Sequence, residues 1–350
     1  MRVYFVSNFY DGCTYVRCIL PTIYNGWWGD KTSMRTPRVS QEDSAKGALS
    51  ADIVVFHRPD DEKRLEAMKL LKQAGKKVVF DNDDTYKSID AMKYKDFLEK
   101  RIEVLDECIK TADLVTTTTE TLAEEYRKLN KNVVVLKNCI DPSDWGKPIK
   151  NDNGKVRIGI VGSVAVNEDF DPIRNLLKSW SNRDEIEIVL FGLPPDDETH
   201  KLNRKIYKPE IDFWKTIKVQ WQPLVPHSDY METLRQLKLD FMVIPRADNY
   251  FNRCKSNLKF LEASILGIPV VAQGFKDGES PYQSKNDKEY MYIATDEKDW
   301  ELMTENLIKS KGLREDMGRE ARKYVINHYN IQKNYKKWEE AYKKLYEKTK

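Results

Sequence analysis

The sequence lacks a long apolar run, a cysteine pair and a strong excess of charge of either sign. No apolar stretch approaches the roughly 20 residues needed to cross a bilayer, and the apolar start at 2–9 becomes polar too soon for a signal peptide. The five cysteines, at 13, 18, 108, 139 and 254, show neither a C-x-x-C pair nor metal-ligand spacing. We therefore expect reduced thiols and a cytoplasmic protein.

Charge and composition exclude further classes of protein. The 350 residues include 59 Lys and Arg against 56 Asp and Glu, which gives a net charge of +3. This balance argues against a protein that coats nucleic acid, although it leaves room for a local basic patch. With 40% hydrophobic and 33% charged residues, the chain is typical of a globular protein and is long enough for two domains with separate cores.

Short β-branched and aromatic segments alternate with amphipathic stretches through most of the chain. The predicted strands are 2–7, 52–57, 77–80, 113–118, 133–137, 156–162, 186–192, 217–221, 240–245 and 268–272. The predicted helices include 61–74, 92–110, 119–129, 171–181, 228–238 and 256–266. This order predicts an α/β protein with parallel sheets and right-handed crossovers. Because the strands are almost continuously apolar, we expect both faces of each sheet to be covered.

A polar break separates the two halves of this pattern. Residues 141–155 are rich in Pro, Gly, Asn and Asp, lack periodicity and are interpreted as an interdomain linker. Each half is predicted to hold one doubly wound, Rossmann-like domain. The final stretch, 330–348, has one apolar helical face and is expected to dock on another part of the protein. This face carries Trp338, Tyr342, Leu345 and Tyr346.

The segment CKSNLKFLEASILGIPVV, residues 254–271, predicts an amphipathic helix with two unusual charges. Its apolar stripe contains Leu258, Leu261 and Ile265. Glu262 projects from this stripe, and Lys255 lies where the helix is expected to begin, where a cation opposes the helix dipole. For an isolated helix, the simpler interpretation is that Glu262 pairs with Lys259 and that Lys255 is solvated.

The place of this helix in the predicted sheet favours a binding role instead. In open parallel sheets the ligand crevice lies beyond the carboxyl ends of the strands, and the loop 245–254 follows such a strand. The free N–H groups from Ser256 onward, together with Lys255, would form an anion site suited to a phosphate. Glu262 would lie one to two turns deeper and accept hydrogen bonds from a diol such as a ribose.

Other polar residues are predicted at the ends of strands in the first half. The run DNDD, residues 81–84, ends a strand where one carboxylate could meet an acceptor hydroxyl; loop structure, or a magnesium or manganese site, is the alternative. His57 ends another strand and could handle a proton or bind an acceptor, an ordinary capping histidine being the alternative. Gly12 follows the first strand, where the backbone could approach a phosphate or sugar.

Aromatic and basic residues are mixed in the loop 24–38. Trp27 and Trp28 stand among Lys31, Arg35 and Arg38, and this combination suits stacking on sugars or bases. Hydrophobic anchoring of the loop is the alternative.

The segment NRCKSNLKFLEASILGIPVVA resembles the nucleotide-sugar signature of the GT-B glycosyltransferases, closest to the retaining family-four (group 1) enzymes of a bacterial and phage branch. Residues 159–173 resemble the glycine loop of the donor domain, and 219–245 resemble the segment that passes the base pocket. Residues 75–86 and 112–126 resemble parts of the acceptor domain. The resemblance extends over nearly the whole chain.

The resemblance implies a two-domain GT-B fold. The first domain, 1–145, would bind the acceptor, and the second, 146–328, would bind the nucleotide sugar. The last helix, 329–350, would cross back to the first domain. The implied activity is transfer of a sugar from a nucleoside diphosphate sugar, preferably a UDP-sugar, to an acceptor hydroxyl with retention and without a metal. If the chain is phage-encoded, the enzyme would work in the host cytoplasm.

The resemblance also suggests roles for individual residues. The diphosphate would rest on 255–257 and Glu262 would hold the ribose, while the leaving diphosphate helps to deprotonate the acceptor. The catalytic candidates are Lys255, Asp84 and His57. The donor-binding candidates are Gly12, Gly162, Ser163, Arg246, Lys255, Ser256, Asn257, Lys259 and Glu262. The acceptor-binding candidates are Trp27, Trp28, Lys31, Arg35 and Arg58.

Two departures from the family pattern keep alternatives open. Cys254 occupies the place of the first of two glutamates, which suggests a sugar-nucleotide-binding protein without catalysis as one alternative. The glycine loop lacks its usual Arg and Lys, so Arg246, Lys255 or Lys259 must meet the phosphate charge. The acceptor is a saccharide, a lipid-linked saccharide, a protein or, as the second alternative, hydroxymethylated phage DNA. In that alternative, Lys31, Arg35, Arg38 and Arg58 would contact DNA phosphates.

Overall fold

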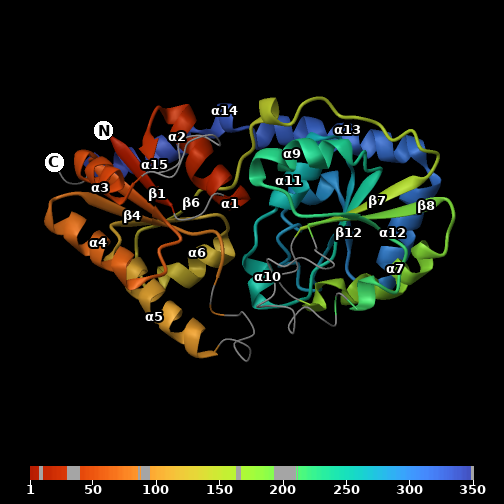
Figure 1. Cartoon of the computed structure of the whole chain (residues 1–350), viewed down its shortest axis with the longest axis horizontal. Coiled ribbons are helices and arrows are strands. Elements are labelled where there is room, and N and C mark those ends of the chain that lie inside the picture. Colours follow the sequence, from red (N-terminus) through yellow and green to blue (C-terminus); the bar gives the residue numbers. More distant parts are fainter. Residues whose placement is uncertain are drawn as a thin grey trace. The chain divides into compact units, whose positions relative to one another are not determined.

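Two parallel sheets of six strands each organise the chain in the computed structural model (Figure 1). The structure describes residues 1–7, 11–29, 40–85, 87, 95–162, 167–192, 210 and 212–347. Contacts divide the chain into two units. The first unit contains Met1–Asp141, Asn249–Ser256 and His328–Lys350, and the second contains Pro142–Asp248 and Asn257–Asn327.

The sheet of the first unit has the strand order β2-β1-β3-β4-β5-β6, with every pair parallel. Its strands are β1 (Val3–Ser7), β2 (Trp28–Gly29), β3 (Ile53–His57), β4 (Lys77–Asp81), β5 (Leu114–Thr117) and β6 (Val133–Val135). Its longer helices are α3 (Gln41–Ser50), α4 (Glu62–Gln73), α5 (Lys95–Thr111) and α6 (Glu120–Arg127). The chain reverses its winding between β1 and β3, which is the usual place for a ligand crevice in such sheets.

Local sequence explains why these helices begin where they do. Asp61 caps α4 by accepting a hydrogen bond from the Arg64 N–H, and Thr119 caps α6 in the same way with Leu122. Both caps follow the end of a buried strand, so the chain turns from sheet to helix within a few residues.

The sheet of the second unit has the order β12-β11-β10-β7-β8-β9 and is also entirely parallel. Its strands are β7 (Val156–Val161), β8 (Ile186–Phe191), β9 (Gln220–Gln222), β10 (Phe241–Ile244), β11 (Val270–Gln273) and β12 (Tyr292–Ala294). Its longer helices are α7 (Arg174–Ser181), α9 (His227–Gln236), α11 (Leu258–Ile265), α12 (Glu297–Lys309) and α13 (Lys311–His328). The buried indoles of Trp180, Trp214 and Trp300 lie in the core of this unit.

Short helical segments complete the chain. They are α1 (Gly12–Thr14), the π-helix η1 (Tyr15–Ile19), α2 (Leu20–Asn25), η3 (Pro142–Asp144), η4 (Asn167–Ile173), α10 (Tyr250–Cys254), η6 (Asp287–Tyr290) and α14 (Ile331–Asn334). The predicted α/β class with two doubly wound sheets is thereby confirmed. Among the helices that the structure describes, none combines the length and the apolar character needed to span a bilayer.

The last helix, α15 (Lys336–Glu347), belongs to the first unit. Trp338 and Tyr342 on its predicted apolar face are buried. The Tyr342 ring lies 5.3 Å from the ring of Trp27 and 6.3 Å from that of Phe5, measured between centroids. The final segment therefore returns to the N-terminal sheet, as predicted.

The boundary between the units, at Asp141 and Pro142, falls inside the predicted linker. The chain also crosses between the units around Asn249–Ser256, which belongs to the first unit although both its neighbours belong to the second. The continuous domain limits predicted from the sequence, 1–145 and 146–328, assign these residues to the second domain. This excursion contains Cys254, Lys255 and Ser256, which belong to the segment singled out from the sequence.

Candidate functional site

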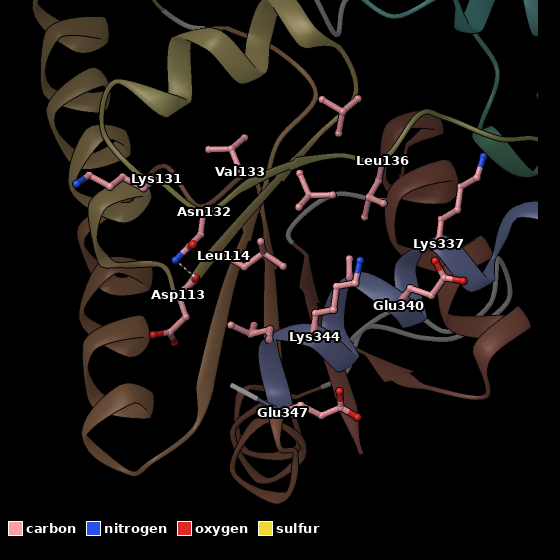
Figure 2. A pocket seen from close by; sticks show the side chains of 14 residues that line it. Asp113, Leu114, Lys131, Asn132, Val133, Leu136, Lys337, Glu340, Lys344 and Glu347 are labelled. Carbon is pink, nitrogen blue, oxygen red and sulfur yellow. Dashed lines mark hydrogen bonds between the residues drawn. The ribbon is translucent and has the colours of Figure 1, made fainter. Parts of the chain in front are cut away.

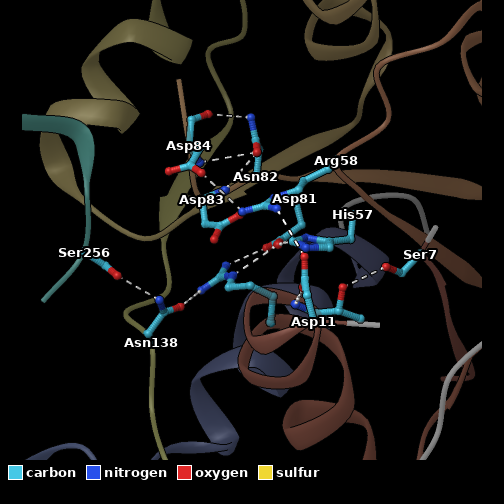
Figure 3. Close-up of polar contacts among 12 residues, drawn as sticks. Ser7, Asp11, His57, Arg58, Asp81, Asn82, Asp83, Asp84, Asn138 and Ser256 are labelled. Atoms are coloured by element: carbon cyan, nitrogen blue, oxygen red, sulfur yellow. Dashed lines mark hydrogen bonds and ion pairs between the residues drawn. The ribbon is translucent and has the colours of Figure 1, made fainter. Parts of the chain in front are cut away.

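Polar side chains gather where β3 and β4 end in the first unit (Figure 3). The parallel register sets His57, the last residue of β3, opposite Asp81, the last residue of β4. Arg58 follows at once with φ of 50°, a left-handed conformation that a bulky side chain rarely adopts and that often marks a functional position. The cluster therefore lies at the edge of the sheet where ligands of doubly wound folds bind.

A buried guanidinium holds the centre of this cluster. Arg17 is fully buried in the π-helix η1, a helix type that is frequent at functional sites. Its Nη2 and Nε lie 2.5 and 3.1 Å from the two carboxylate oxygens of Asp81. It also donates to the backbone oxygen of Leu136 and, over 3.3 Å, to the side-chain oxygen of Asn138. One side chain thus joins η1, β4 and the segment after β6.

Asp81 is held as a carboxylate, and this fixes the tautomer of His57. Burial acts to raise the pKa of Asp81, but Arg17 and the hydrogen bond from His57 outweigh it and lower this pKa to about 2. Because an ionised carboxylate only accepts hydrogen bonds, the Nδ1 of His57, 3.0 Å away, must donate. The Nε2 of His57 is buried and has no hydrogen-bond partner among the described residues. That nitrogen is therefore the unpaired atom of the dyad, and the His57 side chain is enclosed by protein.

The carboxylates after β4 face cations. Arg58 contacts Asp83 at 2.7 Å, Asp84 at 3.3 Å and Asp11 at 3.7 Å. Burial acts to raise the pKa of Asp83, but the neighbouring Arg58 outweighs it and holds this pKa far below its usual range. In the described part of the chain, no three His, Cys, Asp or Glu side chains are grouped to hold a metal ion. The charge of Arg58 is already matched by carboxylates.

Lys255 approaches the same carboxylates from the excursion segment. Its Nζ lies 2.6 Å from Asp84 and 4.1 Å from the centroid of the Phe251 ring. The segment is fastened on both sides of this lysine. The Thr119 hydroxyl donates to the backbone oxygen of Cys254 over 3.1 Å, and the Asn138 amide donates to the Ser256 hydroxyl over 3.0 Å.

The predicted helix start at Lys255 and Ser256 is wrong by two to three residues. The chain forms two helices here, because α10 ends at Cys254 and Lys255 has the extended backbone angles φ −61° and ψ 153°. The next helix, α11, begins at Leu258 with Asn257 at its N-cap. Lys255 therefore lies between two helices and is ion-paired with Asp84, so it is not solvated as the simpler interpretation expected.

Cys254, at the position of the missing glutamate, is fully buried in the core of the first unit. Burial raises the pKa of its thiol to about 12. A neutral, inaccessible thiol cannot replace a carboxylate near a reacting sugar.

Glu262 is buried on α11 in the second unit, on the stripe predicted for it. Its Oε2 accepts from the Tyr230 hydroxyl over 2.7 Å and from the Lys259 ammonium over 2.8 Å. The Tyr230 ring in turn stacks on Phe191, with 5.3 Å between centroids. Oε1 of Glu262 has no partner in the part of the chain that the structure describes. The pairing with Lys259 exists, yet it leaves one carboxylate oxygen available to a ligand.

Three of the predicted donor-binding residues of the second unit come together. Gly162 has φ of 138°, which favours glycine, and a Cβ there would lie 3.6 Å from the Cε of Lys259. Lys259 is itself bonded to Glu262. The next predicted residue, Ser163, lies outside the described residues.

Two of the remaining donor candidates, Arg246 and Asn257, have partners within the protein. Arg246 contacts Asp169 at 2.8 Å; burial acts to lower the pKa of Arg246, but Tyr282 and Asp169 outweigh it and raise this pKa. Asn257 donates to Asp287 over 2.8 Å. Gly12 opens α1 directly after its N-cap residue and lies in the first unit.

The predicted acceptor residues divide into two groups. Trp27 is half-buried and stacks on Phe5 at 6.1 Å, which fits an anchoring role, whereas the side chain of Trp28 is 69% exposed. Lys31, Arg35 and Arg38 lie outside the described residues.

Sequence reasoning missed several residues that build the site. Arg17 was not considered, although an arginine within the apolar stretch YVRCIL is an available signal. Asn138 and Tyr230 carry no such signal, because their roles depend on contacts with Ser256, Arg17 and Glu262 that only the fold creates.

A separate cavity of about 770 Å³ lies along the edge strand β6 and α15 in the first unit (Figure 2). Valines of β6 and charged side chains of both signs line it, among them Lys131, Lys337 and Glu340. None of the predicted site residues is part of its lining.

The chain resembles known proteins in sequence and in fold. Residues 169–340 match the family described as glycosyl transferase-like. No curated protein sequence matches the chain. Among solved structures, sucrose-phosphate synthase of Thermosynechococcus elongatus is 13% identical with a TM-score of 0.65, and the match covers 99% of each chain. HepE of Anabaena, solved with UDP and glucose, is 10% identical with a TM-score of 0.67 over 98% of this chain and 99% of HepE.

A further solved structure, TarM of S. aureus in complex with fondaparinux, α-GlcNAc-glycerol and UDP, is 14% identical with a TM-score of 0.57. That match covers 83% of this chain and 55% of TarM. At identities of 10–14%, the three structures establish a shared fold. Residues 169–340 are thus similar in sequence to the glycosyl transferase-like family, and the fold of the chain is that of the GT-B glycosyltransferases.

Proposed function

We propose that this protein transfers a sugar from a nucleoside diphosphate sugar to an acceptor hydroxyl, with a UDP-sugar as donor and with retention at the anomeric carbon. The observation that carries the proposal is Glu262, a buried carboxylate inside the family segment with one oxygen fixed by Tyr230 and Lys259. Its other oxygen is suited to a ribose hydroxyl. The complexes of HepE and TarM, both solved with UDP, support this choice of donor.

The diphosphate would be met by cations rather than by a metal. Lys259 is fixed beside Glu262, and Lys255 stands two residues before the N-cap of α11. Free N–H groups in the first turn of that helix favour an anion, and the two ammonium groups add full charges. These charges would stabilise the leaving diphosphate as the glycosidic bond to the donor breaks. Transfer is accordingly expected to continue in the presence of EDTA.

The acceptor would meet the strand-end cluster of the first unit. Asp84, whose side chain is 24% exposed, is its candidate contact for a hydroxyl group, whereas the His57 side chain is fully buried behind it. Arg58 already faces three carboxylates, so it is poorly suited to bind a DNA phosphate. This favours a saccharide, free or linked to a lipid or protein, over DNA. All five cysteines are free thiols, which suits the proposed cytoplasmic location.

The Glu262→Ala variant tests the proposal. Loss of the carboxylate that accepts from the ribose is expected to weaken UDP binding at least about tenfold, measured by isothermal titration calorimetry. Glu232→Ala is the matched control, because Glu232 forms an i,i+3 pair with Arg235 on the exposed surface of α9. Equal UDP affinity in wild type and Glu262→Ala would contradict the assignment. Retention is tested separately by the anomeric proton coupling of the product in NMR.

Two other functions have an observation in their favour. The buried Cys254 favours a protein that binds sugar nucleotides without catalysis; binding of a donor panel with neither hydrolysis nor transfer would support it. The exposed Trp28 favours an enzyme that stacks on bases of hydroxymethylated DNA. A hexose or pentose mass gain in nucleosides from such DNA, incubated with protein and donors, would support that second function.

A further inference from the structure

We propose that Asp84 holds the ammonium of Lys255 and gives it up to the donor diphosphate. The inference rests on the proposed function, since it assumes that a nucleotide binds at the start of α11. It adds an order of events, because the carboxylate becomes available to an acceptor hydroxyl only after the donor has taken the lysine.

The contacts around Lys255 define a single position for its charge. The Nζ lies 2.6 Å from Asp84 and above the Phe251 ring, so that the carboxylate and the ring face both hold the cation. The side chain is only 22% exposed. Hydrogen bonds from Thr119 to Cys254 and from Asn138 to Ser256 hold the residues on either side of Lys255. A change of partner would therefore move the side chain of Lys255 and not its backbone.

Asp84 can lose this partner at little cost. Its second carboxylate oxygen lies 3.3 Å from Arg58, and its side chain is 24% exposed. When Lys255 leaves, Arg58 still compensates the carboxylate through its second oxygen, and the first oxygen becomes free for another donor. A diphosphate offers the ammonium more negative charge than one carboxylate does, so exchange is favourable when a donor is present.

The exchange makes a prediction with an unusual sign. Because Asp84 competes with the nucleotide for one ammonium, Asp84→Asn is expected to bind UDP about three- to tenfold more tightly than wild type. The same variant is expected to have a lower kcat for transfer, because the acceptor loses its carboxylate contact. A purely structural role would weaken UDP binding and lower the melting temperature together.

The experiment measures UDP binding to the full-length protein by calorimetry, with thermal unfolding of each variant alongside. Asp113→Asn is the control, because Asp113 also pairs with a lysine, Lys72 at 3.1 Å, and its side chain is 19% exposed. UDP affinity of this control is expected to equal that of wild type. Asp84→Ser replaces the amide variant if the latter does not fold.

A double variant isolates the pair. In a Lys255→Met background the Asp84→Asn change is expected to leave UDP affinity unaltered, because no ammonium is left for which Asp84 and the nucleotide could compete. Unchanged or weaker UDP binding in Asp84→Asn, next to clear binding by wild type, would overturn the inference and leave the proposed function standing. No UDP binding by wild type would remove the proposed function and the inference together.

Discussion

At the scale of single residues, buried charge organises the strand-end edge of the first unit. Arg17 is fully buried and neutralises Asp81, and through Asp81 it sets the hydrogen that His57 donates. Through Asn138 it reaches Ser256, next to the lysine that would meet the donor. A hydrophobic residue could fill the same volume but could not hold Asp81, Leu136 and Asn138 in one geometry, so the arginine fixes the arrangement of the cluster as well as the fold.

Replacement of Arg17 tests this role. Arg17→Met leaves the charge of Asp81 buried and uncompensated, which is expected to cost about 3–5 kcal/mol of unfolding free energy. Arg17→Lys keeps the charge but cannot reach Asp81, Leu136 and Asn138 together, so it is expected to restore only part of the loss. Urea unfolding measures both. Arg127→Met, which removes a surface pair with Glu120, is expected to cost at most about 1 kcal/mol.

At the scale of elements, the sequence predicted those strands and helices that a local pattern of apolar residues determines. The buried strands and the helices of the crossovers follow from continuous apolar runs and apolar stripes, and these predictions hold. The two-residue strand β2 and the edge strand β12 were missed, because neither has a pattern long enough to show periodicity. The break between α10 and α11 was missed because the sequence around Lys255 contains neither Pro nor Gly, the residues that most often end a helix.

The site shows the same limit more sharply. His57 and Asp84 were selected because they follow apolar strands, and the fold places both at the strand-end edge. Arg17 and Asn138 lie 121 positions apart, and Asn138 and Ser256 lie 118 apart. No local pattern signals such contacts, since they exist only once the sheet is assembled.

The final helix offers a test at the scale of one element. Trp338 of α15 is 1% exposed, and the Arg17 guanidinium lies 5.8 Å from its ring centroid. Trp338→Ala is expected to cost about 3–5 kcal/mol of unfolding free energy, because it leaves a cavity between α15 and the N-terminal sheet. Lys343→Ala on the exposed face of the same helix is expected to change stability by less than about 0.5 kcal/mol. Equal stability of the two variants in urea would show that α15 does not support the first unit.

At the scale of the whole molecule, both units have the same architecture but different chemistry. The first has its carboxylates, His57 and three cations gathered at one edge of its sheet, whereas the second fixes Glu262 and Lys259 on a helix. The excursion of residues 249–256 brings Lys255 to the carboxylates of the first unit, while the peptide that follows it enters α11 of the second.

The buried ion pair predicts how the first unit responds to acid. The folded-state pKa of Asp81 is about 2, below its ordinary value of 3.8, because Arg17 and His57 favour the carboxylate. Such a group stabilises the folded state fully above its unfolded pKa, and the stabilisation is lost as pH falls from about 4 towards 2. A shift of this size corresponds to roughly 2 kcal/mol.

Hydrogen exchange followed by mass spectrometry can locate this loss. Peptides covering β3 and β4 are expected to lose protection as pH falls from 5 to about 2, after correction for the intrinsic exchange rate. Asp81→Asn removes the titrating group, so its protection is expected to be lower at pH 7 and to change less over the same range. If wild type and variant lost protection in parallel, the acid sensitivity of the first unit would come from its exposed carboxylates, and the pair of Arg17 and Asp81 would not control it.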